Sequence, residues 1–363
     1  MITILGHTDG FSGTSRHAIS FALALSRREE IAWIPVDAGP RNAASGPWDR
    51  WLENGRGPVA DSISIGIGAP DVMPRVRGRK RIGWVVWETT RMPQSRARHL
   101  TELDEIWTPT AWGRQVLIDS GVEPARIEVV PEGVDPTVFR PIPRDGLPAG
   151  PFRVLSVGRW EPRKGFDLLL RAWAKAFEPS DPVELVLHTS HPSDPSWRLE
   201  DALRRRNLGP HAPVVWSRPT SLPHLVLLYN RCDCFVTATR GEGWGLPVFE
   251  ALACGKPVIV PRFGALAELL DDRTADFIDV ARQVPAHDGR VFLRDEDCGQ
   301  WAEPDPDHLV ELLRNAREHP EEGEARGRRG REAVVEGWTW DHSVEIASPH
   351  LERLRSARGG RTA

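Results

Sequence analysis

The sequence predicts an α/β protein with two doubly wound domains that face a cleft, and three observations support this prediction. The chain has 363 residues, which is more than one compact core usually holds. Both halves alternate short apolar strands with amphipathic helices, a pattern typical of parallel sheets with helices on both faces. Proline and glycine crowd together at residues 141–151, which indicates a linker between the halves.

The first half opens on a strand, ITILGH, which leads through the loop TDGFSGTSR into the helix HAISFALALSRR. Apolar residues recur in that helix at helical spacing. Later strands are expected at IAWIPV, SISIGIG, IGWVVWE and EIWTPT. The helix AWGRQVLIDSG then ends on a glycine, and IEVVPEGVD closes the half. The first domain is therefore expected at residues 1–145.

The second half repeats this rhythm from the strand FRVLSVGRW and the helix KGFDLLLRAWAKAF onward. Strands are expected at VELVLHTS, APVVWS, CFVTAT and PVIVP, and helices at WRLEDALRRRNLG, SLPHLVLLYNRC, LPVFEALACG and GALAELL. The chain is expected to be helical after residue 302, and the second domain to cover residues 146–335. Ligands of open parallel sheets bind beyond the carboxyl ends of the strands, so the loops after the strands are expected to carry the site.

Composition argues against several classes of protein. The formal net charge of −4 gives no indication of nucleic-acid binding. No apolar run approaches the roughly 18 residues that a membrane-spanning helix needs. The first residues resemble a strand rather than a secretory signal, so a cytoplasmic location is expected, with peripheral membrane attachment as an alternative. The four cysteines lack zinc spacing and are interpreted as reduced thiols, so no metal is expected.

The loop SVGRWEPRKGF combines a glycine with two basic residues at the start of a helix. Gly158 permits close approach of a ligand, and Arg159 and Lys164 follow it. A helix N-terminus already attracts anions, and arginine and lysine add donors and charge. The combination suits a diphosphate. The alternative is that both cations are solvated loop charges.

The loop RGEGWGLPVFEALACG places two carboxylates around a glycine-rich turn. Gly243 and Gly245 let the backbone approach a ligand. Glu242 in the turn could accept hydrogen bonds from the hydroxyls of a sugar. Glu250, one turn into the helix, could accept hydrogen bonds from the hydroxyls of a ribose. The alternatives are a surface glutamate at position 242 and a favourable helix-dipole interaction at position 250.

A third glycine loop follows the first strand, at Gly10, Phe11, Ser12 and Gly13. It lacks the dinucleotide-binding fingerprint, so a nicotinamide site is not expected. Its backbone N–H groups could meet a ligand held by the other domain. A plain turn between strand and helix is the alternative.

GRWEPRKGFDLLLRAW and RGEGWGLPVFEALACGKPVIV resemble the two motifs of retaining glycosyltransferases of family 4, the glycosyl transferases group 1. The resemblance covers most of residues 80–270 and includes the family's Glu-x7-Glu pattern. It implies a GT-B fold, with two Rossmann-like domains and a C-terminal helix at 336–363 that crosses back to the first. It also implies a nucleotide-diphosphate sugar as co-substrate, no cofactor and no metal.

The resemblance also implies roles for individual residues. Arg159 and Lys164 would hold the donor diphosphate, Glu250 the ribose, and Glu242 the transferred sugar. Amides around the sugar and phosphate would come from Gly243, Trp244, Gly245 and Leu246, and the loop at residues 10–13 would face the diphosphate. Two departures stand out: GFSG lacks the family's adjacent glycines, and Glu88 stands where many members carry a sugar-contacting histidine. Glu88 is therefore an acceptor-side candidate, with a salt-bridged loop carboxylate as the alternative.

The implied reaction is transfer of the sugar with retention, by front-face attack assisted by Arg159 and Lys164. The acceptor is open: a glycan, a natural product, a lipid-linked molecule or a nucleic acid. The basic cluster at residues 75–81, RVRGRKR, would meet an anionic partner or form a solvated loop. A sugar-nucleotide epimerase or hydrolase of GT-B fold, or a non-catalytic sugar-nucleotide-binding protein, are the alternative functions.

Overall fold

The computed structural model describes residues 1–10, 12–36, 51, 61–143, 150–191, 193–206, 208–218 and 221–357. The chain forms two compact units, each described here by itself. The first contains residues 1–87, 91–135 and 338–363, and the second contains residues 88–90 and 136–337.

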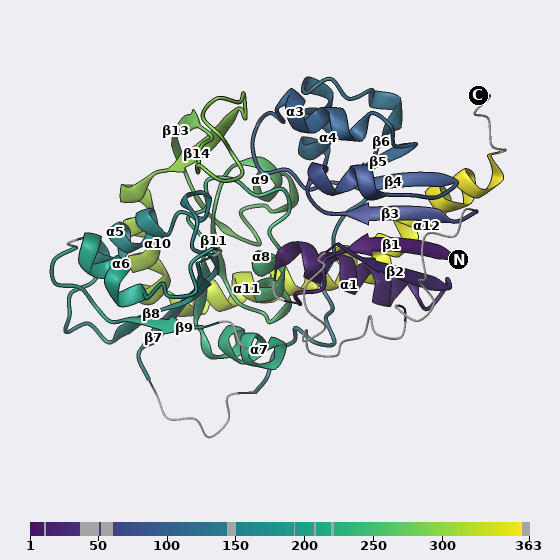
Figure 1. The fold of residues 1–363 in the computed structure, drawn as a ribbon. Helices are drawn as coiled ribbons and strands as arrows, with labels where there is room; N and C mark the ends of the chain where they lie inside the picture. Colours follow the sequence, from purple (N-terminus) through teal and green to yellow (C-terminus); the bar gives the residue numbers. More distant parts are fainter. Residues whose placement is uncertain are drawn as a thin grey trace. The chain divides into compact units, whose positions relative to one another are not determined.

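The first unit is built on a parallel sheet with the strand order β2-β1-β3-β4-β5-β6 (Figure 1). Its strands are β1 (Ile2–Gly6), β2 (Ile31–Pro35), β3 (Ile63–Ile67), β4 (Lys80–Trp84), β5 (Glu105–Thr108) and β6 (Ile127–Val129). Its α-helices within the described ranges are α1 (Gly13–Leu25), α3 (Gln94–Ala97), α4 (Ala111–Asp119) and α12 (Trp340–Ser356). Every residue of β1 is buried, as expected for an inner strand of a parallel sheet.

Tryptophans of the first unit pack in its core. Trp84 and Trp107 are fully buried and meet edge to face with ring centroids 5.3 Å apart, and Phe21 of α1 packs against Trp84. Trp87 is 3% exposed. These side chains contribute apolar burial to the core of the unit.

The second unit is built on a parallel sheet with the order β12-β11-β10-β7-β8-β9. Its strands are β7 (Phe152–Arg159), β8 (Val183–Ser190), β9 (Val214–Ser217), β10 (Cys234–Val236), β11 (Val258–Pro261) and β12 (Asp276–Ile278). Its α-helices are α5 (Phe166–Ala176), α6 (Leu199–Arg206), α7 (Leu222–Arg231), α8 (Leu246–Ala253), α9 (Gly264–Leu269), α10 (Pro306–Glu318) and α11 (Pro320–Gly337). Counted from β7, this is the Rossmann order, whose direction reverses between β7 and β10. The prediction of two doubly wound α/β domains is confirmed.

No helix or strand is expected from the sequence between residues 271 and 302, and the structure has two strands that begin there besides β12. β13 (Val280–Pro285) and β14 (Gln300–Pro304) form a separate antiparallel pair. All six residues of β13 are exposed or half-buried, so the strand has no buried face. Without an apolar face, its sequence shows no hydrophobic alternation that would predict a strand.

The long second-unit segment begins at residue 136, before the proline- and glycine-rich segment. Asn230 of the second unit accepts a hydrogen bond from the backbone N–H of Ile142 and donates one to the carbonyl of Arg140. The chain is therefore already attached to the second unit at these residues. The three residues from Glu88 to Thr90 also group with the second unit, although β4 before them belongs to the first.

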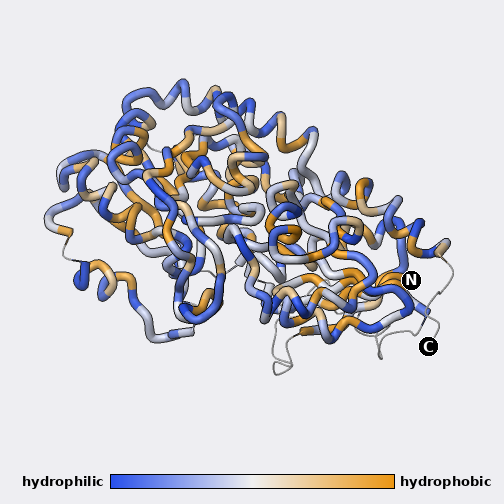
Figure 2. Tube along the Cα trace, turned by 90° about the horizontal axis from the view of Figure 1, so that it is seen from above, coloured by the Kyte–Doolittle hydropathy of each residue, from blue (hydrophilic) through white to orange (hydrophobic). Residues whose placement is uncertain are grey.

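Hydropathy follows the layers of each unit, as Figure 2 shows, with hydrophobic residues along the inner strands and hydrophilic residues along many outer helical turns. The four cysteines are buried, and no disulfide joins any two of them. No helix among the described residues is long and apolar enough to cross a membrane.

Candidate functional site

The candidate site lies at the carboxyl ends of β7 and β10, the two strands between which the order of the second sheet reverses. Ligands of open α/β sheets bind at such a reversal, because the connecting helices diverge to opposite faces there. The loops after these two strands are the two motif loops, residues 159–165 and 237–245. The fold therefore brings both motifs to one place.

A tight turn sets the direction of the side chains after β7. Residues Pro162–Lys164 form a 3₁₀ turn, and Gly165 follows with φ +66°. A Cβ atom at Gly165 would lie 1.9 Å from the carbonyl oxygen of Ala238, in the loop after β10. Glycine is required here by backbone conformation and by space, because only glycine lets the two loops approach this closely.

Lys164 and Glu242 form a short ion pair between the two loops. Lys164 Nζ lies 2.6 Å from Glu242 Oε1, and both side chains are nearly buried, with 14% and 10% exposed. Arg163 donates to the carbonyl of Gly241 at 2.8 Å and contacts Glu242 Oε2 at 3.3 Å. The Glu242 carboxylate is thus held by two cations, one on each oxygen.

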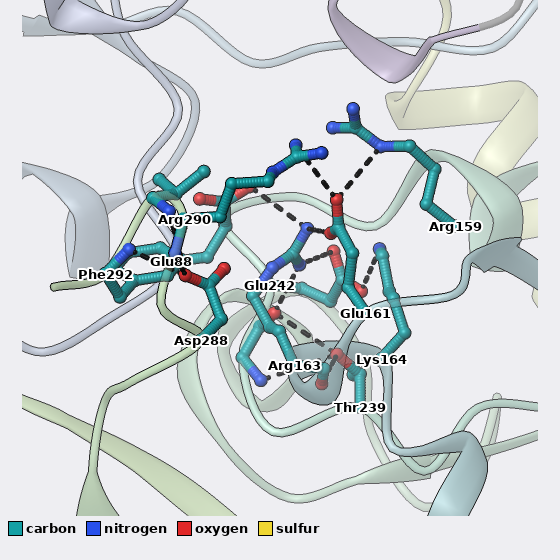
Figure 3. Close-up of polar contacts among 12 residues, drawn as sticks. Glu88, Arg159, Glu161, Arg163, Lys164, Thr239, Glu242, Asp288, Arg290 and Phe292 are labelled. Atoms are coloured by element: carbon teal, nitrogen blue, oxygen red, sulfur yellow. Dashed lines mark hydrogen bonds and ion pairs between the residues drawn. The ribbon is translucent and has the colours of Figure 1, made fainter. Parts of the chain in front are cut away.

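Glu161 gathers three guanidinium groups around a second buried carboxylate (Figure 3). Arg159 Nε and an Nη atom of Arg290 each lie 3.4 Å from its Oε1, and Arg163 lies 3.7 Å from its Oε2. Glu161 is 9% exposed, whereas Arg159 and Arg290 are 47% and 40% exposed. The Glu161 carboxylate is therefore buried, whereas the guanidinium groups of Arg159 and Arg290 carry positive charge at the surface.

Glu88 joins this cluster from an earlier part of the chain. Its Oε1 lies 3.4 Å from an Nη atom of Arg163, and its side chain is 26% exposed. Two hydrogen bonds between Thr90 and Gln300 fix the segment, and a Cβ atom at Gly241 would lie 2.1 Å from the carbonyl of Glu88. Glu88 is thus an ion-paired carboxylate, as the second alternative stated for it expects, and its contact with an acceptor stays a prediction.

Burial and neighbouring charges shift the pKa values of the cluster in different directions. Burial raises the pKa of Glu88, and the positive charges of Arg163 and Lys164 offset only part of this increase. Burial also acts to raise the pKa of Glu242, but Lys164 and Arg163 outweigh it and lower this pKa. Burial lowers the pKa of Lys164, which Glu242 opposes without cancelling. Glu242 therefore stays ionised, and Glu88 is protonated first as the pH falls.

Glu250 lies on α8, apart from the cluster around Arg163. It is 2% exposed and accepts a hydrogen bond from the Tyr229 hydroxyl at 2.8 Å. Gly245, with φ +103°, precedes the helix. Residues Gly243–Leu246 are all buried, and Trp244 stacks on Phe249 with centroids 4.7 Å apart.

The N-terminal glycine loop belongs to the first unit. Ser12 caps α1 by accepting from the N–H of Ser15, Asp9 bonds to Ser12, and Gly10 has φ +72°. Gly13 begins the helix, and Phe11 lies outside the described residues. These contacts shape the turn from β1 into α1. That the loop faces a diphosphate stays a prediction.

The structure adds two residues that sequence reasoning missed, Arg163 and Arg290. Arg163 stands between a proline and Lys164 in a loop already rich in charge, so its sequence position gave no sign of burial. Arg290 lies in the segment to which no element was assigned. No sequence signal identified Arg163, because the turn that positions it depends on contact between Gly165 and the loop after β10.

The basic cluster at residues 75–81 is occupied with local partners. Arg75 donates to the carbonyl of Val36, and Arg79 to the carbonyls of Arg355 and Ala357. Lys80 lies 3.8 Å from Asp104. These contacts bind the basic side chains to the protein itself, which gives no support to the alternative of an anionic partner.

Residues 151–290 match the family model described as glycosyl transferases group 1. D-inositol 3-phosphate glycosyltransferases of Mycobacterium bovis and Mycobacterium tuberculosis are 34% identical over 212 residues, which cover 56% of this chain and 40% of those relatives. The match therefore spans less than half of the length of these relatives.

Solved structures match almost the whole chain at low identity. HepE of Anabaena in complex with UDP-glucose has a TM-score of 0.70 at 16% identity, covering 98% of this chain and 99% of that one. Sucrose-phosphate synthase of Thermosynechococcus elongatus has a TM-score of 0.71 at 16% identity, with the same coverage. At this identity the likeness concerns the fold.

The two parallel-sheet units and these neighbours define the GT-B fold. Within that class, residues 151–290 are similar to the glycosyl transferases group 1 family, in agreement with the resemblance carried by the two motifs.

Proposed function

We propose that the protein is a retaining glycosyltransferase that moves a sugar from a nucleotide-diphosphate sugar to a hydroxyl acceptor. One observation carries the proposal: Lys164 and Glu242, which the motifs assign to diphosphate and sugar, form a 2.6 Å pair at the reversal of the sheet order. The burial of charges is costly, and buried charges with shifted pKa values cluster at functional sites, so the pair favours a functional role for this position. The names of the curated relatives and the UDP-sugar complex of HepE support the same class.

In the proposed reaction the bond between the anomeric carbon and the β-phosphate oxygen breaks, and a bond to the acceptor oxygen forms on the same face. The acceptor's proton passes to an oxygen of the departing diphosphate. Negative charge grows on that group, and Arg159 and Lys164 stabilise it. Preorganised donors of this kind are worth about 3–4 kcal/mol each. Glu242 and Glu250 would hold hydroxyls of the sugar and the ribose.

Retention follows in this scheme because attack and departure share one face. With an α-linked donor, proton NMR of the first product should show the α-anomer. A β-linked product would contradict the front-face step. Side-chain cations supply the positive charge, so activity should persist in EDTA, whereas its loss would show that a metal is needed.

A thermal-shift panel of UDP-, GDP-, dTDP- and ADP-sugars tests the proposal. We expect one nucleotide class to raise the melting temperature with EDTA present, because ligands that bind only the folded state stabilise it. The shift should shrink in Glu250→Ala, which loses the ribose carboxylate. Glu311→Ala, at an exposed position on α10, is the matched control and should keep the full shift.

The panel also separates the alternatives. A shift in wild type that Glu250→Ala retains in full would remove Glu250 from the donor site. The absence of a shift with every donor would contradict donor binding by the free protein. Release of free sugar, or a changed sugar in the absence of an acceptor, would favour a hydrolase or an epimerase.

A further inference from the structure

The β13–β14 hairpin is fixed to the candidate site at its base. The N–H of Ala302 on β14 donates to the carbonyl of Arg240, which follows β10. The Arg240 guanidinium bonds to Glu303 at 2.7 Å and to Asp167 at 2.9 Å. Arg240 N–H in turn donates to the carbonyl of Arg163 at 2.7 Å. The hairpin therefore has a defined position relative to both motif loops.

The loop between β13 and β14 is ordered by its own contacts. Asp288 Oδ1 accepts hydrogen bonds from the N–H groups of Arg290, Val291 and Phe292, at 2.8, 2.8 and 2.9 Å. Phe292 is 2% exposed and packs edge to face on Trp301. This turn and its apolar anchor direct Arg290 towards Glu161, as Figure 3 shows.

Arg290 and Arg159 share one carboxylate oxygen. Each guanidinium lies 3.4 Å from Glu161 Oε1, and Arg163 contacts the other oxygen. Arg163 is also paired with Glu242 and Glu88, and the single charge of Glu161 cannot neutralise both exposed guanidinium groups, so positive charge remains on the exposed side. Each guanidinium has five N–H donors, so one contact with Glu161 leaves donors for an anion.

We propose that Arg290 is a second exposed arginine of the donor site, which binds the donor's diphosphate together with Arg159. The proposal rests on the proposed function. Two guanidinium groups on one oxygen are close enough to contact neighbouring phosphates, and guanidinium–phosphate pairs are strong and geometrically specific. Glu161 acts as a positioning residue that keeps the two arginines side by side before the nucleotide binds.

Calorimetric titration with UDP, UMP and uridine, or with the corresponding set for another base if the panel selects one, tests this assignment. In Arg290→Gln the dissociation constant for the diphosphate should rise about tenfold, the equivalent of one charge-assisted hydrogen bond. The nucleoside should bind as to wild type, because it carries no phosphate. Arg290→Lys should recover part of the affinity, because it keeps the charge without the planar donor pair.

Arg294→Gln is the matched control, because Arg294 is exposed in the same loop and bonds to His287 rather than to Glu161. It should bind all three ligands like wild type. If Arg290→Gln binds the diphosphate normally while Arg159→Gln does not, the assignment of Arg290 is wrong and the proposed function stands. If wild type binds none of the nucleotides of the panel, both are wrong. An effect of Arg290→Gln confined to donors with an anionic sugar would also overturn the diphosphate assignment.

Discussion

Glu88 links the candidate site to pH, because burial raises the pKa of its carboxyl above the usual value near 4.5. The folded protein keeps this proton at pH values where the unfolded chain has lost it. Stability therefore falls as the pH rises from the unfolded pKa through the folded one. Glu88→Gln, which cannot ionise, should lack this part of the slope.

Urea unfolding of wild type and Glu88→Gln between about pH 4 and 8 measures the difference. Glu311→Gln, an exposed position on α10, should follow wild type. Glu242 contributes with the opposite sign, because its lowered pKa costs stability only as the pH falls below the usual value near 4.5. Equal slopes for wild type and Glu88→Gln would show that Glu88 ionises alike in both states.

The loop after β7 shows how far the sequence predicts the roles of single residues. Residue type and spacing were enough to select Arg159, Lys164, Glu242 and Glu250, because the motif chemistry depends on them. Sequence could not distinguish exposed Arg159 from buried Arg163. That difference arises from the 3₁₀ turn and the left-handed Gly165, which are decided by contact with the loop after β10.

At the scale of elements, Gly165 controls how closely the loops after β7 and β10 approach. Gly165→Ala should lower the free energy of unfolding by more than about 2 kcal/mol, because it adds left-handed strain and a backbone clash at the Ala238 carbonyl. Gly337→Ala is the matched control, since a Cβ atom there would meet nothing within 4 Å. Denaturant unfolding measures both variants, and equal stability of Gly165→Ala and wild type would contradict the requirement for glycine.

The β13–β14 hairpin is an element that hydrophobic patterns in the sequence do not predict. The inner strands β1, β3 and β11 are apolar and buried throughout, so composition predicts them. The hairpin is short, polar and separate from both sheets, and contacts with Arg240 hold it in place. Such contacts join residues far apart in sequence, so no local pattern reveals them.

At the scale of the whole molecule, each unit has its own parallel sheet. In the first unit, Arg353 of α12 pairs with Glu105 at 2.6 Å and Glu128 at 2.8 Å. Glu105, Glu128 and His350 form the one group of three side chains in the described ranges that could hold a metal ion, and Arg353 pairs with both carboxylates. In the second unit, the Rossmann order places the reversal point between β7 and β10, where both motifs lie.

The central claim is that cations after β7 stabilise the departing diphosphate. The initial rate of nucleoside-diphosphate release, with the donor that stabilises wild type most, tests it in Lys164→Ala. Lys175→Ala is the control, because its side chain on α5 is 63% exposed in a surface pair with Asp307. We predict a rate about 10²–10³-fold lower in Lys164→Ala, a wild-type rate in Lys175→Ala, and folded protein in both. A folded Lys164→Ala variant with a near-wild-type rate would contradict the claim.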